Sequence, residues 1–241
     1  MELTFDDFRD RALDKGLSKW EKIGFPDGYR KGVEFAIFED ISFKTRLASA
    51  GSVLDIGCGC SELVERVISF SQKSQQQLYL VDSQEMLNNI DAKYLNDQTH
   101  LVPGRFPDKE VVLKLPEASF DVVIVYSVIQ YAFISQSVYG FIHECVKLLK
   151  PGGRLLIGDI PNYQARERFL ASEGGREFLS KAPQVNNTIN LQHENLERID
   201  DSVIMSLLFR FRNFGCETYL LPQPEDLPFA NRREDILIIK R

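Results

Sequence analysis

Residues 52–61 read Ser-Val-Leu-Asp-Ile-Gly-Cys-Gly-Cys-Ser, a short apolar run that ends in a turn with two glycines. Leu63, Val64, Val67 and Ile68 follow at the spacing of one helix face. Glycine adopts positive φ without strain and lets a ligand approach the backbone closely. The stretch therefore predicts a strand, a ligand-binding turn and a helix.

The same alternation continues to the end of the chain. Further strands are expected at 78–81, 99–102, 120–126, 154–160, 218–221 and 235–240. Amphipathic helices are expected between most of them, and a proline-rich loop separates the last two strands. Alternating strands and helices predict an α/β fold, a doubly wound Rossmann-like sheet of seven strands. The sheet should be mainly parallel, with an antiparallel last strand.

Two segments fall outside this alternation. Residues 1–50 are helical in pattern, and residues 161–200 are polar and precede the last helix. We expect a single domain over 1–241, with a core of 51–160 and 201–241, an N-terminal helical cap of 1–50 and a substrate-cap insert of 161–200. Ligands of open α/β sheets bind at the carboxyl ends of the strands, where both segments can reach.

Composition limits the classes of function. The chain has 241 residues and a net charge of −6, which argues against a basic nucleic-acid-binding face. It has no apolar run of the roughly 20 residues that a membrane span needs, and its acidic start does not resemble a signal peptide. Four cysteines without a disulfide pattern predict reduced thiols and a cytoplasmic protein. No matching cysteine pair or histidine cluster accompanies Cys58 and Cys60, so no metal site is expected.

The glycine turn and two acids indicate the ligand. A dinucleotide-binding loop would read G-x-G-x-x-G, but Glu62 stands at the sixth position and would repel a pyrophosphate. This argues against a nicotinamide-dependent oxidoreductase. Asp55 can accept a hydrogen bond from a ligand ammonium, and Asp82, at the end of the second strand, can bind two ribose hydroxyls. A nucleoside with a cationic amino-acid tail meets these conditions, and S-adenosylmethionine is such a molecule.

Each of these residues also has a purely structural interpretation. Gly57 and Gly59 can simply serve a tight strand-to-helix turn. Asp82 can be an acid placed favourably at a helix N-terminus. Met86 fits a core position whatever else it contacts.

Four motifs together resemble a known family. VLDIGCGCSEL, LYLVDSQEML, FDVVIVYSVIQY and LLKPGGRLLIGDIP are similar, in order and spacing, to the motif set of class I S-adenosylmethionine-dependent methyltransferases. Ser61 replaces the last glycine of the family's first motif, and Arg105 stands where the family often has aspartate. The resemblance implies S-adenosylmethionine as cofactor and S-adenosylhomocysteine as product.

The resemblance also implies cofactor contacts for particular residues. The backbone of Gly57, Cys58 and Gly59 would line the methionine part, and Asp82, followed by Ser83, would bind the ribose. Met86 and Phe106 would lie near the adenine. The backbone of Tyr126 and Ser127 would face the ammonium and the sulfonium.

The acceptor is constrained by what the motifs lack. No Asn/Asp-Pro-Pro-Tyr/Phe element follows the fourth expected strand, and no Pro-Cys nucleophile occurs, so methylation of DNA bases is not expected. His193 is the one histidine placed to reach the acceptor, and it can equally be a solvated loop residue. Asp159 and Tyr163, at the end of the fifth strand, are further catalytic candidates. Arg30 can bind the cofactor carboxylate or an acidic acceptor, or form a surface ion pair.

A weaker resemblance concerns the cap segments. EKIGFPDGYRKGVE, GDIPNYQARERFLASEGG and LPQPEDLPFANRREDILI are similar to methyltransferase-like proteins that accompany bacterial surface-polysaccharide enzymes. This implies a small-molecule or glycan-precursor hydroxyl as acceptor. The alternative is a regulatory module that binds S-adenosylmethionine but has lost catalysis. The oligomeric state does not follow from the sequence.

Overall fold

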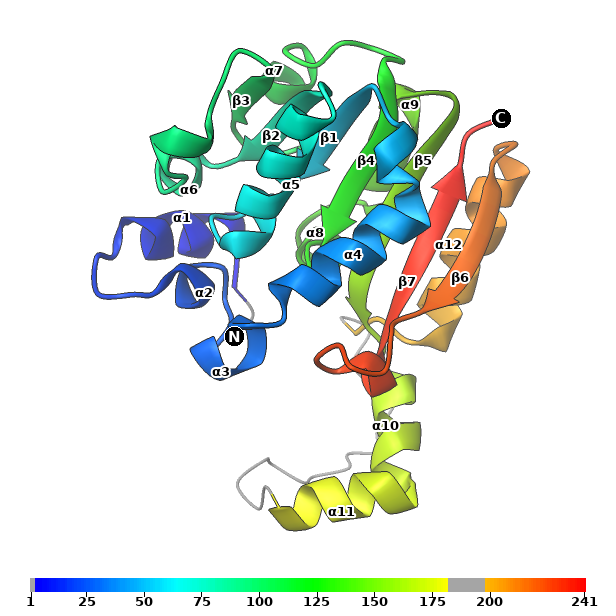
Figure 1. Ribbon diagram of the computed structural model, residues 1–241. Coiled ribbons are helices and arrows are strands. Elements are labelled where there is room, and N and C mark those ends of the chain that lie inside the picture. The colour runs from blue at the N-terminus through cyan, green and yellow to red at the C-terminus, as the bar shows by residue number, and fades with distance from the viewer. Residues whose placement is uncertain (1–2, 182–197) are drawn as a thin grey trace.

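One sheet organises the chain, and the computed structural model describes residues 3–181 and 198–241 of it (Figure 1). The strand order is β3-β2-β1-β4-β5-β7-β6. Every neighbouring pair is parallel except the two pairs that β7 forms with β5 and β6. The predicted fold class, a seven-stranded mainly parallel sheet with an antiparallel last strand, is confirmed.

The strands agree with the predicted ranges except at the start of β5. They are β1 Ser52–Ile56, β2 Gln77–Asp82, β3 Thr99–Pro103, β4 Phe120–Tyr126, β5 Leu149–Pro161, β6 Glu217–Pro222 and β7 Arg233–Ile239. The turn glycines that were expected to precede β5 lie inside it. Gly152 donates to the carbonyl of Lys240 at 2.7 Å, and Lys240 donates to that of Gly153 at 3.0 Å, so pairing with the C-terminus extends the strand.

The helices are α1 Phe5–Leu13, α2 Lys19–Lys22, α3 Asp27–Arg30, α4 Glu34–Thr45, α5 Glu62–Lys73, α6 Gln84–Leu87, α7 Lys109–Val112, α8 Ile129–Ser135, α9 Val138–Leu148, α10 Tyr163–Ala171, α11 Glu173–Lys181 and α12 Asp201–Asn213. Short 3₁₀ turns are η1 Leu47–Ser49, η2 Ala92–Tyr94 and η3 Ala230–Arg232. Between β2 and β3, where an amphipathic helix was expected, the structure has only the single turn α6. Its continuation stops because Asp91 caps η2 instead, with its side chain accepting from the Lys93 N–H.

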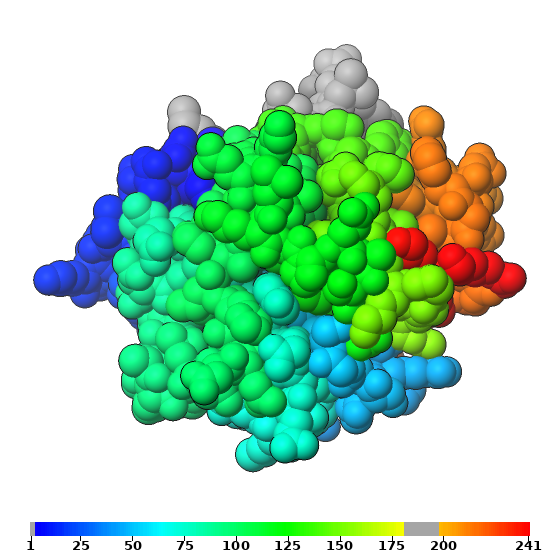
Figure 2. Space-filling model, turned by 90° about the horizontal axis from the view of Figure 1, so that it is seen from above, coloured from blue at the N-terminus to red at the C-terminus, as the bar shows by residue number. Residues whose placement is uncertain are grey.

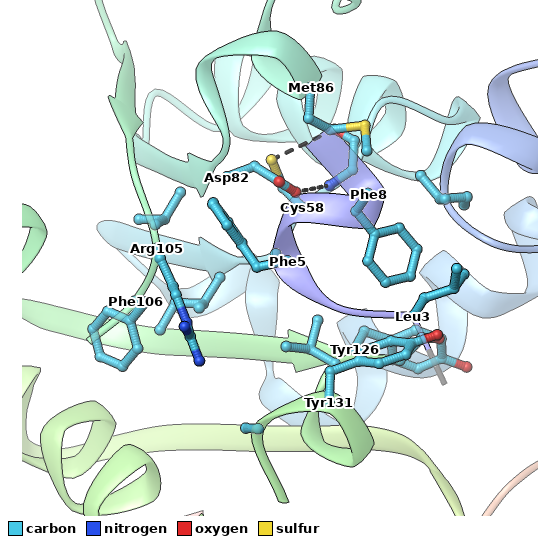
Figure 3. Close-up of a pocket in the computed structure, with 18 of the residues that line it drawn as sticks. Leu3, Phe5, Phe8, Cys58, Asp82, Met86, Arg105, Phe106, Tyr126 and Tyr131 are labelled. Atoms are coloured by element: carbon cyan, nitrogen blue, oxygen red, sulfur yellow. Dashed lines mark hydrogen bonds between the residues drawn. The ribbon is translucent and has the colours of Figure 1, made fainter. Parts of the chain in front are cut away.

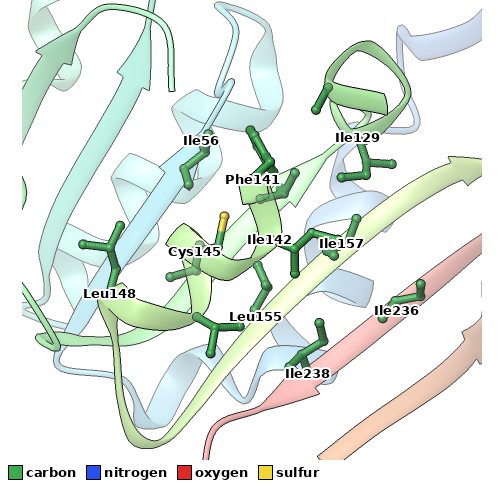
Figure 4. Close-up of a cluster of buried hydrophobic side chains, with 14 of the residues drawn as sticks. Ile56, Ile129, Phe141, Ile142, Cys145, Leu148, Leu155, Ile157, Ile236 and Ile238 are labelled. Carbon is green, nitrogen blue, oxygen red and sulfur yellow. The ribbon is translucent and has the colours of Figure 1, made fainter. Parts of the chain in front are cut away.

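Apolar side chains fill the space on both faces of the sheet. Helices α8, α9 and α12 cover one face, where Phe141, Ile142 and Cys145 meet residues of β5 and β7 (Figure 4). Helices α4 and α5 cover the other face. Strand β4 serves both, because alternate residues along it point to opposite sides, and this explains its apolar run from Val122 to Tyr126.

Of the two segments outside the alternation, helices α1 to α3, α10 and α11 lie at the carboxyl edge of the sheet, whereas α4 packs on a face of it (Figure 1). Helix α1 contacts α6 and α2, and α3 follows with Arg30 against Ser127 and Asp159, whereas α10 and α11 extend away from the sheet below β5. Seen from above, the first two helices and the C-terminal strand β7 lie on opposite sides of the molecule (Figure 2). Within the described residues, none of the helices has the length and apolar character needed to cross a membrane.

Candidate active site

A pocket opens where the carboxyl ends of β1, β2 and β4 meet the N-terminal helices (Figure 3). Its empty volume, counted out to the mouth, is about 1200 Å³. This volume includes open solvent at the mouth, so it is an upper bound beside the roughly 300–1,000 Å³ of typical ligand sites. Its walls are Leu3, Thr4, Phe5, Phe8, Ile23, Phe25, Arg30, Ile56, Gly57, Cys58, Gly59, Ser61, Leu63, Val81, Asp82, Met86, Gly104, Arg105, Phe106, Tyr126, Ser127, Val128, Tyr131, Ala132, Ile134, Ser135, Gln136 and Phe141.

The turn between β1 and α5 forms one wall from its backbone. Gly57 and Gly59 have φ of 72° and 65°, in the region that favours glycine. A Cβ on Gly57 would lie 2.5 Å from a methyl of Val128, and one on Gly59 would lie 2.8 Å from a methyl of Ile23. Both glycines are therefore required by local geometry, and the bare backbone they leave faces the pocket.

Asp82 ends β2 at this wall and holds the glycine turn in place. Its Oδ2 accepts from the Gly59 N–H at 2.9 Å, and its Oδ1 accepts from the Ser83 N–H at 2.7 Å. Burial raises the pKa of Asp82 to about 6, and the two backbone donors limit the rise. A carboxylate has lone pairs for further donors, so Asp82 can bind hydroxyls from the pocket side while it keeps both backbone bonds.

Asp55 lies in β1 behind the same turn and is buried. It is not a wall residue of the pocket, unlike its neighbours Ile56 and Gly57. Its carboxylate makes no hydrogen bond within residues 3–181 and 198–241. Burial first, and then the charge of Asp82, raise its pKa to about 7. Two acids thus share one end of the pocket, and the structure places the expected ammonium partner Asp55 one layer behind the surface.

Arg30 brings a buried positive charge to the other end of the pocket. It is the last residue of α3, and its guanidinium lies 4.2 Å from the centre of the Phe25 ring and 5.5 Å from that of Tyr126. Its Nη2 donates to the hydroxyl of Ser127 and, at 3.3 Å, to Oδ2 of Asp159. The alternative of a surface ion pair for Arg30 is excluded, because the side chain is 5% exposed.

Ser127 directly follows β4, and Asp159 lies near the end of β5, the parallel neighbour of β4. Both residues have positive φ, of 60° and 57°. The Ser127 hydroxyl donates to Asp159 Oδ2. Arg233 also lies 3.7 Å from the Asp159 carboxylate. Asp159 does not line the large pocket; it lines a small second cavity that Arg30 and Tyr126 separate from it. The structure therefore corrects its expected place at the pocket edge, because Ser127 stands between Asp159 and the pocket.

The N-terminal segment supplies an apolar wall that the sequence alone did not reveal. Leu3, Phe5 and Phe8 point into the same cavity as Asp82 and Tyr131 (Figure 3). The Phe8 ring meets the Tyr131 ring edge-on with centroids 4.9 Å apart. The spacing of Phe5, Phe8 and Ala12 marks one face of a helix, which would ordinarily be interpreted as a core face.

Other predicted cofactor residues have mixed positions. Met86, Phe106 and Tyr126 line the pocket as expected, and Met86 is also part of the core against α5. Ser83 is buried and caps α6, accepting from the Met86 N–H at 3.1 Å, and it is not a wall residue. Cys58 lines the pocket, and burial raises the pKa of its thiol well above the usual range, so the thiol stays protonated.

The remaining catalytic candidates are not brought to the pocket. Tyr163 begins α10 with its ring 4.2 Å from the Arg198 guanidinium, and it lines neither cavity. His193 lies outside the described residues. Arg105, which stands where the family often has aspartate, lines the pocket and donates to the Ser135 hydroxyl at 3.0 Å.

The comparisons with known proteins agree with this geometry. Residues 54–157 match the family model described as a methyltransferase domain. No curated protein matches the sequence significantly. Among solved structures, the plantazolicin methyltransferase BamL, crystallised with S-adenosylhomocysteine, is 13% identical with a TM-score of 0.60, over 98% of this chain and 97% of that chain.

Two further structures show the same fold. An O-methyltransferase family protein from Burkholderia thailandensis is 16% identical with a TM-score of 0.61, over 100% of this chain and 64% of that chain. A phosphoethanolamine-type N-methyltransferase from Haemonchus contortus is 16% identical with a TM-score of 0.55, over 99% of this chain and 60% of that chain. The methyltransferase-domain match over residues 54–157, the sheet order and the pocket at the ends of β1 and β2 together support an S-adenosylmethionine-dependent methyltransferase.

Proposed function

We propose that this methyltransferase modifies a hydroxyl group of a small molecule, and that a glycan precursor is the class of acceptor. The observation that carries the proposal is the hydroxyl of Ser127, which lies at the pocket wall between Arg30 and Asp159. We also assign residues 1–50 the role of a cap on the pocket. The four free cysteines fit a reducing compartment, and we place the protein in the cytoplasm.

The backbone and side-chain groups that line the pocket suit the separate parts of S-adenosylmethionine. The backbone of Gly57, Cys58 and Gly59 would hold the methionine part, and Asp82 would bind the ribose hydroxyls. Phe106 and Met86 would contact the adenine. The N–H groups of Arg30 other than those on Nη2 have no partner among residues 3–181 and 198–241, so they are available to a carboxylate.

When bound, S-adenosylmethionine supplies a methyl group on a positively charged sulfur, which keeps the carbon–sulfur electron pair as the acceptor oxygen bonds to the methyl carbon. The chain must then orient the acceptor hydroxyl and remove its proton. A serine oxygen offers one donor and two acceptor lone pairs. In Ser127 the donor is used by Asp159 and one lone pair by Arg30, which leaves one lone pair for the acceptor O–H.

This arrangement supports a short proton path. The acceptor proton would pass to the Ser127 oxygen while the Ser127 proton passes to Asp159. Asp159 acts through Ser127 and is a positioning residue in this scheme. His193 remains the alternative base, and its contribution stays a prediction. Tyr163 is not retained, because it lines neither cavity.

The test is methyl transfer from a deuterated methyl donor to paired acceptors, with products identified by mass spectrometry. Bacterial sugar nucleotides would be compared with amines of similar size. Ser127→Ala should lower kcat by about 10²–10⁴-fold, the usual contribution of acid–base groups, while S-adenosylhomocysteine affinity stays within a few fold. Ser119→Ala, at the opposite edge of the sheet, is the matched control.

Two results would contradict the proposal. Unchanged turnover in Ser127→Ala would remove the proton path through Asp159, and a parallel loss in His193→Ala would transfer the role to that histidine. Binding of S-adenosylhomocysteine without methyl transfer to any acceptor of a broad panel would favour the regulatory module. Transfer to amines alone would replace O-methylation by N-methylation.

A further inference from the structure

A cluster of arginines lies beside the small cavity that Asp159 lines. Arg232, in η3, has its guanidinium inside a cage of three rings, with centroids 5.0 Å away for Phe169, 5.1 Å for Phe178 and 5.0 Å for Phe229. Two of these rings come from α10 and α11, which extend from the sheet edge (Figure 1). Aromatic faces stabilise a cation, but they leave its N–H donors unused.

Arg232 has no acidic partner in the part of the chain that the structure describes. Among the described residues, the one hydrogen bond of its side chain runs from Nε to the side chain of the adjacent Asn231, at 3.0 Å. The backbone N–H of Asn162 donates to the Arg232 carbonyl at 3.2 Å, and Arg166 lies one helical turn after Asn162 on α10, near enough for the two guanidinium groups to repel each other. The Arg166 side chain makes no hydrogen bond or ion pair within residues 3–181 and 198–241. Burial first, and then the charges of Arg166 and Arg233, lower the pKa of Arg232.

The neighbouring acids are already engaged. Asp159 is bound by Arg30 and lies within 3.7 Å of Arg233. Glu234 accepts from the side chain of Asn162 at 2.6 Å. Within residues 3–181 and 198–241, the guanidinium groups of Arg166 and Arg232 therefore have no ion-pair partner, in a chain whose net charge is −6. Juxtaposed like charges are unfavourable unless another group neutralises them.

The cluster is continuous with the active site through one ring. Phe229 contacts Arg232 and also lines the small cavity with Asp159, Arg30 and Tyr126. Arg30 and Tyr126 in turn line the large pocket. The cluster therefore lies one layer of side chains behind the pocket wall at Arg30 and Tyr126, and an acceptor that extends around this wall would reach it.

We propose that Arg232 and Arg166 bind a phosphate group of the acceptor. This inference rests on the proposed function, since it names the class of small molecule whose hydroxyl is methylated. A phosphate monoester carries a charge near −2 at neutral pH, which balances two guanidinium groups, and arginine binds its oxygens in a forked geometry. A carboxylate would balance only one of them.

The binding test uses inorganic pyrophosphate with protein saturated by S-adenosylhomocysteine. Pyrophosphate should raise the Tm of the wild-type chain and bind in calorimetry, and malonate at equal ionic strength should bind at least tenfold more weakly. Arg232→Gln and Arg166→Gln should each weaken pyrophosphate binding at least tenfold. Arg210→Gln is the matched control, because Arg210 also stacks on a ring, that of Tyr139, at 5.0 Å, but lies on α12.

The activity test compares a sugar phosphate with the same sugar without phosphate. Arg232→Gln should raise KM for the phosphorylated acceptor at least tenfold with little change in kcat, and should not affect the neutral acceptor. Arg232→Lys, which keeps the charge but not the fork, should give an intermediate KM and serves if Arg232→Gln folds poorly. A purely structural arginine would change Tm without this split between acceptors.

Failure of the inference and failure of the proposed function give different results. Absent pyrophosphate binding, or equal binding by wild type and both glutamine variants, overturns the phosphate site even if hydroxyl methylation is observed. Stronger binding of malonate than of pyrophosphate would likewise overturn it in favour of a carboxylate. Pyrophosphate binding that depends on Arg232, with methyl transfer only to amines, would keep the site and refute O-methylation.

Discussion

Replacing Asp82 by asparagine separates the cofactor hypothesis from a purely structural role of this acid. Asparagine has nearly the same shape, but one of its two oxygens becomes an N–H₂ donor. Asp82 uses one oxygen for Gly59 and the other for Ser83, so asparagine can satisfy only one of these donors. Ribose hydroxyls would also lose a charged acceptor. Hydrogen bonds to charged groups contribute about 1.5–3 kcal/mol each.

The expected loss of affinity follows from these values. Weakening two such bonds should cost about 3 kcal/mol, or about a hundredfold in the Kd of S-adenosylhomocysteine at pH 8. Asp121→Asn is the matched control, because Asp121 also accepts from two backbone N–H groups, of Gly51 and Ser52, but at the opposite edge of the sheet. The Asp121→Asn variant should bind S-adenosylhomocysteine with the Kd of the wild type. Calorimetry measures each Kd, and Tm verifies the fold.

Proton release gives a second measurement of the same site. The pKa of Asp82 is about 6 and that of Asp55 is about 7, so the free protein at pH 6 holds about half a proton on the first and about nine-tenths on the second. A ligand that donates hydrogen bonds or carries positive charge favours the ionised acids and expels these protons. Affinity should therefore fall as pH falls below 7, and binding at pH 8 should release only about a tenth of a proton.

The asparagine variant should release fewer protons at pH 6. Residue 82 no longer titrates, and loss of its charge also lowers the pKa of Asp55. Calorimetry in two buffers of different ionisation enthalpy counts the protons. The reasoning is refuted if Asp82→Asn binds S-adenosylhomocysteine within threefold of wild type at pH 8. Equal proton release by wild type and variant would show that Asp82 is not in the ligand contact.

Three further changes test other parts of the structure. Gly57→Ala should destabilise the protein by about 1–3 kcal/mol in urea unfolding, because φ is 72° and the new Cβ would meet Val128 at 2.5 Å. Lys44→Met should lower the free energy of unfolding by about 3–5 kcal/mol in the same assay. The buried carboxylates of Asp40 and Asp235, which Lys44 binds at 2.6 and 2.7 Å, would lose their only cationic partner among the described residues. Phe8→Ala should raise the Kd of S-adenosylhomocysteine several-fold, because it opens the wall against Tyr131, whereas Phe43→Ala, at a side chain 84% exposed, should leave that Kd unchanged.

The fold could be predicted because its signals are local. The glycine turn, the apolar strands and the Ser61 cap of α5 each act within a few residues. Strand β4 is apolar and buried at every position from Val122 to Tyr126, and such a run on both faces is typical of a parallel strand covered by helices on both sides. The position of Asp82 at the end of β2 follows from the same pattern.

The acceptor side could not be predicted because its contacts are long-range. Asp159 has φ of 57°, and nothing in its neighbours signals that conformation. Its carboxylate lies behind Ser127 because Arg30, 129 residues earlier, and Arg233 bind it there. The facing of Phe8 toward Tyr131 likewise depends on how the N-terminal segment folds back over the sheet.

Buried charges beside the neighbouring strands β5 and β7 are balanced by other residues of the chain. Asp40 and Asp235 are bound by Lys44, and Asp159 is bound by Arg30 beside Arg233. Such pairs contribute little net stability, since the desolvation of both partners offsets their attraction. They fix side chains in place, and here they fix Arg30 and Asp159 on either side of Ser127.

Two other pairs of charges are left unbalanced within the described residues, and they have opposite signs. Asp55 and Asp82 have no cationic partner among these residues, and burial raises the pKa of both. They lie at the end of the pocket assigned to a cationic cofactor. Arg166 and Arg232 find no acid near the proposed acceptor path. Asp55 is buried and the other three side chains are half-buried, and an uncompensated charge shielded from water costs free energy that a ligand of opposite charge recovers in part on binding. The charge pattern therefore favours a cationic methyl donor at one end and an anionic acceptor at the other.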